Sequence, residues 1–378
     1  MDSISEITIF TVGDANAIST WSNVPYFFTK SIADKNIHVN KVNIKENALL
    51  NFIYRYTVYA FLKIFYKNTT HTYFRSRLNY FLTNIKIRRS IKRYNSSQAF
   101  IFLTFSFGIP KTKSKKIVLF GDWSYLYLIR NFHKREPFWF EKRALNCEEK
   151  NIRSADFVLS LFPESKKFNT ETYKAHHCYY LGNVINSSFS IDKKELVKLK
   201  SQSKKLLFIG NKKYLQGALD LIQAFKEFNL SNNSEIELHI IGLNTSDTGI
   251  TLRNLFQHGY LDKGNKDENT LYYKLISEAR FIVNTNKNWG AFSAMTEAMY
   301  YYTPVITTPY SEFVATYGKV ASFGFYVESE SQKELGEAIE KLLKNTQEEY
   351  HTMMNAAHDK VKDFTWERYT DKLLELIS

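Results

Sequence analysis

The sequence predicts an α/β protein made of two similar halves, each a parallel sheet covered by helices. The clearest sign lies between residues 204 and 312, where short apolar runs that end at glycine alternate with helix-like spacing of apolar residues. Such alternation is typical of parallel sheets. A similar apolar run at residues 7–10 begins the first half. The length of 378 residues suits two domains that each bury a core of their own.

The first half opens with a buried strand at residues 7–10, which ends in a turn at Gly13. A helix is expected over residues 24–34, because Pro25 is tolerated in a first helical turn. Residues 47–94 are expected to be mostly helical. The remaining expectations for this half are strands at 99–105, 116–120 and 156–160, a long helix over 135–153 and a final element at 179–183.

A polar stretch rich in Lys and Ser, residues 186–203, predicts the linker between the halves. The second half then starts with a buried strand at 206–209 that ends at Gly210. A helix follows on which Leu215, Leu219, Ile222 and Phe225 recur with helical spacing. The elements expected after it are strands at 238–242 and 281–283 and a helix that carries Glu297.

The last expected helix, residues 364–377, is amphipathic and begins near a capping arrangement of Asp363, Thr365 and Glu367. We expect it to pack back on the first half. The predicted fold is therefore two Rossmann-like domains facing across a cleft, with a C-terminal helix that crosses back. The expected divisions are 1–185, 186–362 and 363–378.

Composition narrows the class of protein. Hydrophobic residues make up 44% of the chain and charged residues 24%, as in globular proteins. The two cysteines, Cys147 and Cys178, are too few for a disulfide framework and indicate a reducing cytosol. Residues 1–6 lack the pattern of a signal peptide. No stretch approaches the roughly 18–20 apolar residues of a spanning helix. We expect a cytoplasmic protein.

The net charge of +13 is concentrated in one region. Residues 47–121 contain fourteen Lys and Arg and no Asp or Glu, and aromatic residues are interleaved with the cations. This mixture is typical of helices that lie on an anionic membrane surface. We therefore expect a membrane-facing region at about residues 47–116, peripheral on the inner face of the cell membrane. An ordinary amphipathic helix with a solvated basic face is the alternative. No nucleic-acid partner is expected, because no nucleic-acid-binding motif accompanies the cations.

The stretch around Glu297 carries the strongest chemical signal. The loop through Gly290 and Ala291 runs into a helix, so free backbone amides near Phe292 and Ser293 suit a diphosphate. Glu297 lies about one turn further and can accept two hydrogen bonds from the vicinal hydroxyls of a ribose. The alternative role for Glu297 is a surface carboxylate that only supports its helix. The sequence favours a nucleotide site.

Lys212 and Lys213 follow Gly210, at the carboxyl end of the first strand of this half. Cations there can neutralise a departing diphosphate, although solvated loop lysines are an alternative explanation. The loop from Gly13 to Asn23 would form the facing wall from the first half. We find no Asp-x-Asp cluster and no His/Cys spacing suited to a metal, so we expect neither metal nor cofactor.

These residues resemble the donor-binding domain of the GT-B glycosyltransferases, specifically the large retaining family 4. The resemblance is strongest in the second half. Its motifs are Phe208-Ile209-Gly210, Gly217 to Phe225, Leu238 to Gly242, Gly259-Tyr260, Gly290 through Glu297 to Ile306, and Glu312. The ending, Phe364 to Tyr369, is similar to the family's crossing helix.

The first half resembles one subgroup of that family in two loops. The stretch from Gly13-Asp14 through Ser22 to Tyr26 is similar to its acceptor-side loop, which usually has Gly where Asn23 stands. Residues 121–124, with Asp122, are similar to the loop that faces the donor sugar. Asp122 either orients or deprotonates the acceptor, or caps its own loop. We expect two catalytic residues, Asp122 from this resemblance and Lys213 from its place after Gly210. The expected substrate-binding residues are Gly13, Asp14, Ser22, Gly210, Asn211, Lys212, Trp289, Gly290, Ala291, Phe292, Ser293 and Glu297.

The sequence departs from the family pattern at several positions. The family usually has a second Glu eight residues before Glu297, where this chain has Trp289. Its diphosphate-binding Arg and Lys are replaced by Asn211 and Gln216, so Lys212 or Lys213 would have to substitute. The usual His of the first domain has no clear equivalent.

The resemblance implies metal-independent transfer of a sugar from a nucleotide-sugar donor to a hydroxyl, with retention of configuration. Given the basic aromatic region, we expect a lipid-linked or surface-polysaccharide acceptor, as in bacterial O-antigen or capsule synthesis. Two alternatives stay open. One is a non-catalytic partner protein that binds a nucleotide sugar or glycan, and the other is a sugar-nucleotide epimerase of the same shape.

Overall fold

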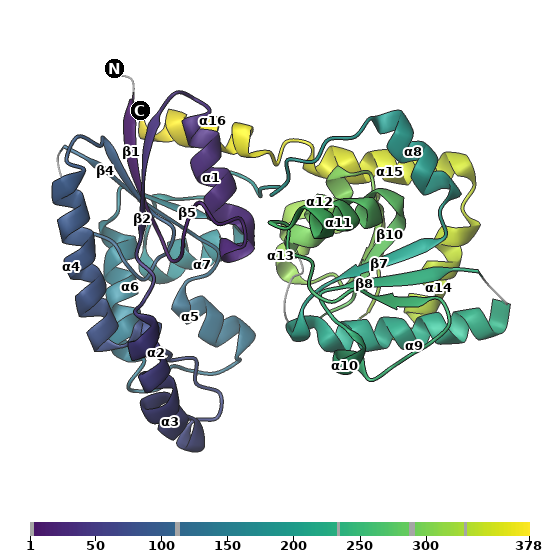
Figure 1. Cartoon of the computed structure of the whole chain (residues 1–378), viewed down its shortest axis with the longest axis horizontal. Coiled ribbons are helices and arrows are strands. Elements are labelled where there is room, and N and C mark those ends of the chain that lie inside the picture. Colours follow the sequence, from purple (N-terminus) through teal and green to yellow (C-terminus); the bar gives the residue numbers. More distant parts are fainter. Residues whose placement is uncertain (1–3, 110–113, 233–234, 287–291, 329–330) are drawn as a thin grey trace. The chain divides into compact units, whose positions relative to one another are not determined.

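The computed structural model describes residues 4–109, 114–232, 235–286, 292–328 and 331–378. The chain forms two compact units (Figure 1). The first unit comprises residues 1–183 together with 366–378, and the second comprises residues 184–365. Each unit contains a six-stranded sheet in which the paired strands are parallel. This confirms the α/β fold class and the two parallel sheets.

The sheet of the first unit has the strand order β2-β1-β3-β4-β5-β6. Its core is rich in aromatic side chains, such as the stacked Phe10 and Phe102, whose ring centroids lie 4.4 Å apart. The strands are β1 (Glu6–Thr11), β2 (His38–Asn43), β3 (Ala99–Phe102), β4 (Lys116–Gly121), β5 (Phe157–Ser160) and β6 (Cys178–Tyr179).

Helices connect these strands, as parallel pairing requires. They are α1 (Val24–Ala33), α4 (Arg77–Arg93), α5 (Tyr125–Tyr127), α6 (Lys142–Ser154) and α7 (Pro163–Tyr173), with the short η1 (Thr20–Asn23), η3 (Tyr73–Arg75) and η4 (Leu128–Phe132).

The C-terminal helix α16 (Trp366–Ile377) packs on α1, as the sequence predicts. The hydroxyls of Ser31 and Thr370 lie 2.8 Å apart, and Lys35 forms an ion pair with Asp371 at 2.6 Å. The Tyr369 ring contacts Phe120 of the sheet, with centroids 5.9 Å apart. The chain therefore leaves the first unit, builds the second and returns.

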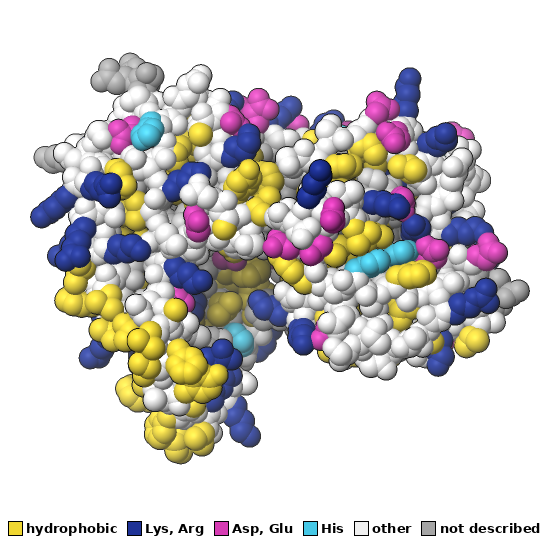
Figure 2. All heavy atoms as spheres, in the orientation of Figure 1, with side chains coloured by type: hydrophobic (Ala, Val, Ile, Leu, Met, Phe, Trp, Pro, Cys, Tyr) yellow, Lys and Arg dark blue, Asp and Glu magenta, His cyan; other side chains and the backbone are white. Residues whose placement is uncertain are grey.

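One helical segment of the first unit has no buried residue. It runs through α2 (Ala48–Tyr54), the π-helical η2 (Arg55–Tyr59) and α3 (Ala60–Phe65), and we call it the apolar helical segment. Several of its large apolar side chains, among them Phe52, Phe61 and Phe65, are at least 60% exposed. Figure 2 shows this end of the unit covered by hydrophobic side chains with cations among them. No helix among the described residues is long and apolar enough to cross a membrane.

The sheet of the second unit has the order β12-β11-β10-β7-β8-β9. The strands are β7 (Lys205–Ile209), β8 (Glu237–Ile241), β9 (Leu255–Gln257), β10 (Ala279–Asn284), β11 (Val305–Thr307) and β12 (Gly324–Tyr326). Helices α9 (Leu215–Asn232) and α14 (Gln332–Lys344) share a core with one face of this sheet. The helices are α8 (Lys193–Gln202), α9 (Leu215–Asn232), α10 (Thr245–Thr248), α11 (Lys266–Glu278), α12 (Phe292–Tyr300), α13 (Ser311–Tyr317), α14 (Gln332–Lys344) and α15 (Gln347–Val361), with η5 (Lys212–Tyr214).

The structure corrects the expected linker. Residues 193–202, placed within it on their polarity, form helix α8, in which Leu196 and Lys200 are buried. Lys200 explains why polarity misled the prediction, because its ammonium is satisfied inside the unit by three acceptors. These are Ile276 O at 2.5 Å, Ala279 O at 3.1 Å and Thr303 Oγ1 at 2.8 Å.

The expected helix over 135–153 is also too long at its start. Residues 135–141 form a loop around the Glu141 carboxylate, which accepts hydrogen bonds from Arg135 and from the Phe138 amide. The helix α6 begins only at Lys142. The strand expected over 99–105 ends at Phe102, and only Tyr179 of the element expected at 179–183 belongs to a strand, β6.

Candidate functional site

The carboxyl ends of β7 and β8 lie unusually close together in the second unit. Gly242 has φ +97°, and a Cβ there would lie 2.4 Å from the carbonyl oxygen of Gly210. The Gly210 amide donates to Ile241 O at 3.0 Å. Position 242 therefore needs glycine, and this close contact holds the loops after the two strands against each other. In a parallel sheet this edge is where ligands bind.

The basic loop after Gly210 forms the short helix η5, capped by the side chain of Asn211, which accepts from the Lys213 amide at 3.0 Å. Lys212 is exposed, and its Nζ lies 2.7 Å from Oδ1 of Asp247 in the short helix α10, which follows β8. This hydrogen bond lowers the pKa of the Asp247 carboxyl. Lys213 is also exposed. The two lysines proposed for the diphosphate thus lie at the carboxyl edge, one of them engaged with a carboxylate.

Glu297 is only 5% exposed and lies on α12, which follows β10 in the chain. Its carboxylate takes part in a closed network. Lys263 Nζ donates to Oε1 at 2.7 Å and to Oε2 at 2.9 Å. The hydroxyl of Tyr272 donates to Oε2 at 2.8 Å, and that of Tyr273 donates to Oε1 at 3.0 Å. Each carboxylate oxygen therefore has two donors within the protein.

Lys263, Tyr272 and Tyr273 are missing from the sequence-based prediction. The lysine lies in the loop between β9 and α11, 34 residues before its partner, and a single loop lysine has no periodic signature. The tyrosines lie on α11 and are buried, which a hydrophobic pattern interprets as core. Burial, with a smaller effect of the Glu297 carboxylate, raises the pKa of both phenols, so both remain hydrogen-bond donors.

The loop after β10 lies against the start of α9. The side chain amide of Asn286 donates to Lys213 O at 3.4 Å. A Cβ at Gly217, in the first turn of α9, would meet the backbone nitrogen of Asn286 at 3.4 Å. The predicted residues Trp289, Gly290 and Ala291, as well as the Phe292 side chain, lie outside the described residues. Ser293, in the first turn of α12, is exposed.

The predicted residues of the first unit lie after β1 and β4. Gly13 has φ +122°, and a Cβ there would lie 2.7 Å from the Thr20 methyl group. Asp14 is exposed and its Oδ1 accepts from the Asn16 amide at 2.9 Å. Ser22 and Asn23 have φ +53° and +71°. The left-handed conformation at Asn23 explains why Gly is usual there, since Asn tolerates it best among the other residues.

Asp122 directly follows β4, at the same edge of the first unit's sheet as Gly13. Its Oδ1 accepts from the Trp123 amide at 2.8 Å, and its carbonyl oxygen accepts from Ser165 Oγ at 2.6 Å. The first of these contacts belongs to loop capping, one of the two roles expected for this carboxylate. Among the described residues no three His, Cys, Asp or Glu side chains gather as a metal site.

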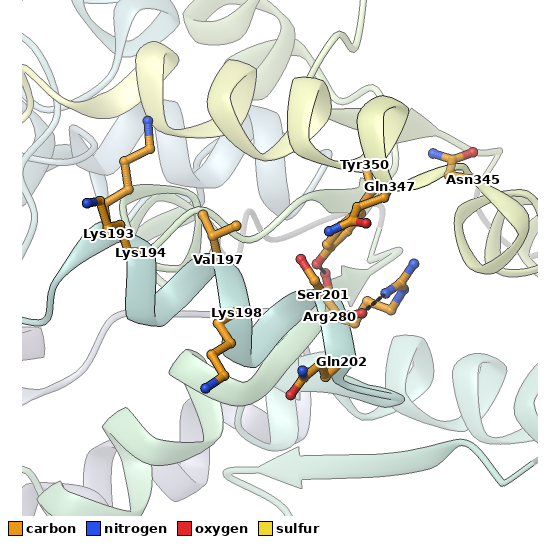
Figure 3. A pocket seen from close by; sticks show the side chains of 10 residues that line it. All are labelled: Lys193, Lys194, Val197, Lys198, Ser201, Gln202, Arg280, Asn345, Gln347 and Tyr350. Atoms are coloured by element: carbon orange, nitrogen blue, oxygen red, sulfur yellow. Dashed lines mark hydrogen bonds between the residues drawn. The ribbon is translucent and has the colours of Figure 1, made fainter.

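A cavity of about 930 Å³ opens elsewhere in the second unit, lined by α8, the start of β10 and the start of α15 (Figure 3). Four cations line it, namely Lys193, Lys194, Lys198 and Arg280, and none of the predicted site residues does. In Figure 3 the ammonium groups of Lys193 and Lys198 point away from each other. Because β10 begins at this cavity, the cavity is distinct from the carboxyl edge of the sheet, where β10 ends.

Comparison with known proteins assigns the second unit to a protein family. Residues 190–360 match the family model of glycosyl transferases group 1, within the unit formed by residues 184–365. No curated protein sequence matches the chain.

Solved structures match the chain over almost its whole length. WaaG, described as a glycosyltransferase involved in lipopolysaccharide biosynthesis, has a TM-score of 0.65 at 14% identity, covering 98% of this chain and 99% of WaaG. Anabaena Alr3699/HepE in complex with UDP and glucose has a TM-score of 0.60 at 11% identity, with 98% of each chain covered. A putative UDP-N-acetylglucosamine 2-epimerase from Listeria monocytogenes has a TM-score of 0.58 at 12% identity, covering 99% of this chain and 95% of the epimerase.

At such low identity these matches show the fold, which transferases and an epimerase share, and the family model carries the assignment to transferases. Residues 190–360 therefore form a group 1 glycosyltransferase domain, and the chain as a whole has the GT-B fold.

Proposed function

We propose that this group 1 glycosyltransferase moves a sugar from a nucleotide-sugar donor, bound by the second unit, to a hydroxyl of a lipid-linked or surface-polysaccharide acceptor. The observation that carries the donor site is the buried carboxylate of Glu297 on α12, which lies within the residues that the family model matches. A buried carboxylate is the kind of group that recognises a pair of ribose hydroxyls. UDP is the first nucleotide to test, because Alr3699/HepE was solved with it.

In the proposed reaction the bond between the anomeric carbon and the diphosphate oxygen breaks with retention of configuration. The acceptor oxygen forms its bond to the same carbon from the same face, and its proton goes to the departing phosphate. Lys212 or Lys213 and the amides at Gly290 to Ser293 stabilise the leaving diphosphate without a metal ion. Trp289 contacts the donor, and Gly13, Asp14, Ser22 and Asp122 belong to the acceptor side. Both lysines are exposed beside Gly210, which supports this role.

The proposed acceptor is carried by a lipid, and the apolar helical segment supports this. It exposes Phe52, Phe61 and Phe65 to solvent, and it carries Arg55 and Lys63. Exposed apolar patches of this kind mark interaction sites. Cations among aromatic rings suit an anionic lipid surface. We therefore place the protein peripherally on the inner face of the cell membrane, in bacterial O-antigen or capsule-type synthesis.

The experiment is a thermal-shift screen of UDP-, GDP- and dTDP-sugars, comparing the native protein with Glu297→Gln. We expect one class of donor to raise the melting temperature of the native protein, and the substitution to abolish that increase. Glu278→Gln is the matched control, because Glu278 also forms an ion pair in this unit, at 2.6 Å from Lys205. Glu278 is the last residue of α11 and lies directly before β10, at the opposite end of that strand from Glu297. A shift that survives Glu297→Gln would contradict the proposed site.

A non-catalytic binding partner is the second candidate, favoured by Trp289, Asn211 and Gln216, which stand where the family has groups that act on the donor. It predicts nucleotide binding without turnover. Incubating the selected donor with lipid-linked acceptor and measuring nucleoside diphosphate release separates the two. An epimerase, whose fold this chain shares with the Listeria protein, would instead convert the sugar nucleotide without any acceptor.

A further inference from the structure

The closed network around Glu297 conflicts with a simple ribose site. Lys263 supplies two of the four hydrogen bonds to the carboxylate, and the hydroxyls of Tyr272 and Tyr273 supply the others. A carboxylate offers about four lone-pair positions. A ribose can therefore bind Glu297 only if one of these three side chains withdraws.

The tyrosines are poorly suited to withdraw. Both are on helix α11 and less than 7% exposed, and the Tyr273 ring is stacked on Phe189 with centroids 4.7 Å apart. Lys263 is better placed to move, because it lies in a loop and has a flexible stem, and its side chain is 12% exposed. Its ammonium would also leave weaker contacts, to Asn186 O at 3.5 Å and to the Tyr272 ring centroid at 4.2 Å.

The ammonium of Lys263 is also the kind of group that the donor needs. The two positions where related sequences place diphosphate-binding cations hold Asn211 and Gln216. Gln216 is bonded to Asp220 at 2.9 Å, and the exposed Lys212 is paired with Asp247. In contrast, Lys263 touches the group that is proposed to hold the ribose, and the diphosphate is attached to that same ribose.

We propose that Lys263 is a cation displaced by the donor: it neutralises Glu297 before the donor binds, yields to the ribose hydroxyls and then pairs with the diphosphate of the same nucleotide. This inference rests on the proposed function. Moving the ammonium off a buried carboxylate is unfavourable by itself, and a diphosphate offsets it by supplying new negative charge. The site should therefore discriminate strongly between a nucleoside diphosphate and the corresponding nucleoside.

Calorimetric titration of the full-length protein tests this with the pairs uridine and UDP, guanosine and GDP, and thymidine and dTDP. Lys263→Met should weaken binding of the preferred diphosphate at least tenfold and leave the nucleoside unchanged or tighter. The ratio of the two dissociation constants should therefore fall at least tenfold. A merely structural Lys263 would weaken both ligands alike and leave this ratio unchanged.

Lys263→Gln is the second variant, because its amide still donates to Glu297 and keeps the buried carboxylate partnered. It should lower the same ratio. Lys266→Met is the control, an exposed lysine at the start of α11 in the same region. An unchanged ratio in both Lys263 variants, with the diphosphate still bound, overturns this inference alone. If none of the three diphosphates binds the native protein, the proposed function fails together with it.

Discussion

The side-chain nitrogen of Lys200 is enclosed by the second unit, and the three acceptors around it are uncharged. Burial lowers its pKa well below the usual 10.5. In the pH range between the lowered pKa and 10.5, the unfolded chain binds a proton that the native protein does not hold. Stability must then rise with pH across that range, by at most about 1.4 kcal/mol per pH unit.

The first prediction compares native protein with Lys200→Met in denaturant titrations at several pH values from 7 to 10. The free energy of unfolding of the native protein should increase with pH relative to that of the variant. Every other group titrates in both proteins, so the difference isolates Lys200. Parallel curves across the whole range would show that Lys200 keeps its ordinary affinity for protons.

His71 titrates in the opposite range. Burial, assisted by the positive charges of Arg75 and Arg143 against the opposing charge of Glu141, lowers the pKa of His71 from 6.5 to about 4. Between these values the unfolded chain binds a proton that the native protein does not accept. Native stability is therefore complete above pH 6.5 and falls by about 3 kcal/mol as the pH approaches 4.

The second prediction is that His71→Leu removes this loss. Denaturant midpoints measured between pH 7 and pH 4 should decrease more steeply for the native protein than for the variant. His38, an exposed histidine on β2, supplies the control substitution His38→Leu. An equally steep decrease in His71→Leu would mean that other groups cause the acid sensitivity.

At the residue scale the sequence predicted those site residues whose role shows in their neighbours along the chain. Glu297 stood out because it follows a glycine-containing loop on an apolar helix, and the structure buries it. Lys263 could not be found, because its meaning comes only from a contact with that distant carboxylate. Asn23 lies between these two cases. The family resemblance indicates that Gly is usual at this position, but only the structure gives the reason, which is the positive φ of Asn23.

At the element scale, strands that are apolar and buried were predicted well, and strands that mix polar and apolar residues were not. β1 and β7 are apolar runs buried in their sheets, and both were expected. β2 was missed, because it is an edge strand with polar residues at most positions and only one buried residue, Val42. Helix α8 was mistaken for a linker, because the hydrogen bonds that bury Lys200 come from residues more than 70 positions away.

The apolar helical segment gives the third prediction, measured as sedimentation with lipid vesicles. Arg55→Gln with Lys63→Gln should weaken binding to phosphatidylglycerol-containing vesicles about 30-fold, since each cation contributes about 1 kcal/mol near an anionic surface. Neutral phosphatidylcholine vesicles should show little difference. Phe61→Ser with Phe65→Ser should weaken binding to both kinds of vesicle, because it removes apolar area.

Leu230→Ser is the control for that experiment, because Leu230 is 77% exposed but belongs to α9 of the second unit. Its binding should equal that of the native protein. Equal binding of all three variants to anionic vesicles would remove the apolar helical segment as the docking surface, without affecting the donor site.

At the scale of the whole molecule, the first unit is assembled from two separate pieces of chain. α16 contributes Trp366, Tyr369 and Leu373 to its core, although the whole second unit precedes this helix in the sequence. The amphipathic ending predicted this return, because a helix with one apolar face must bury it. Which residues of the first unit receive it, such as Phe28 and Phe120, was beyond the sequence pattern.

The fourth prediction follows from that assembly. Tyr369→Ala should destabilise the first unit by about 3–5 kcal/mol, because the tyrosine is 2% exposed and its ring fills the space beside Phe120. Tyr369→Phe is the matched control and should be nearly neutral, since the hydroxyl has no hydrogen-bond partner among the described residues. Hydrogen exchange should locate the loss of protection in residues 4–183 rather than in 184–365.

The return of α16 also has a consequence during biosynthesis. A ribosome releases the sheet of the first unit early, but the helix that covers Phe28 and Phe120 is translated only after all of residues 184–365. The second unit can fold as soon as it emerges, whereas the first must wait with an aromatic surface open to chaperones. Chaperones should accordingly bind nascent chains stalled before Trp366 through the N-terminal residues of the first unit rather than through the most recently translated residues.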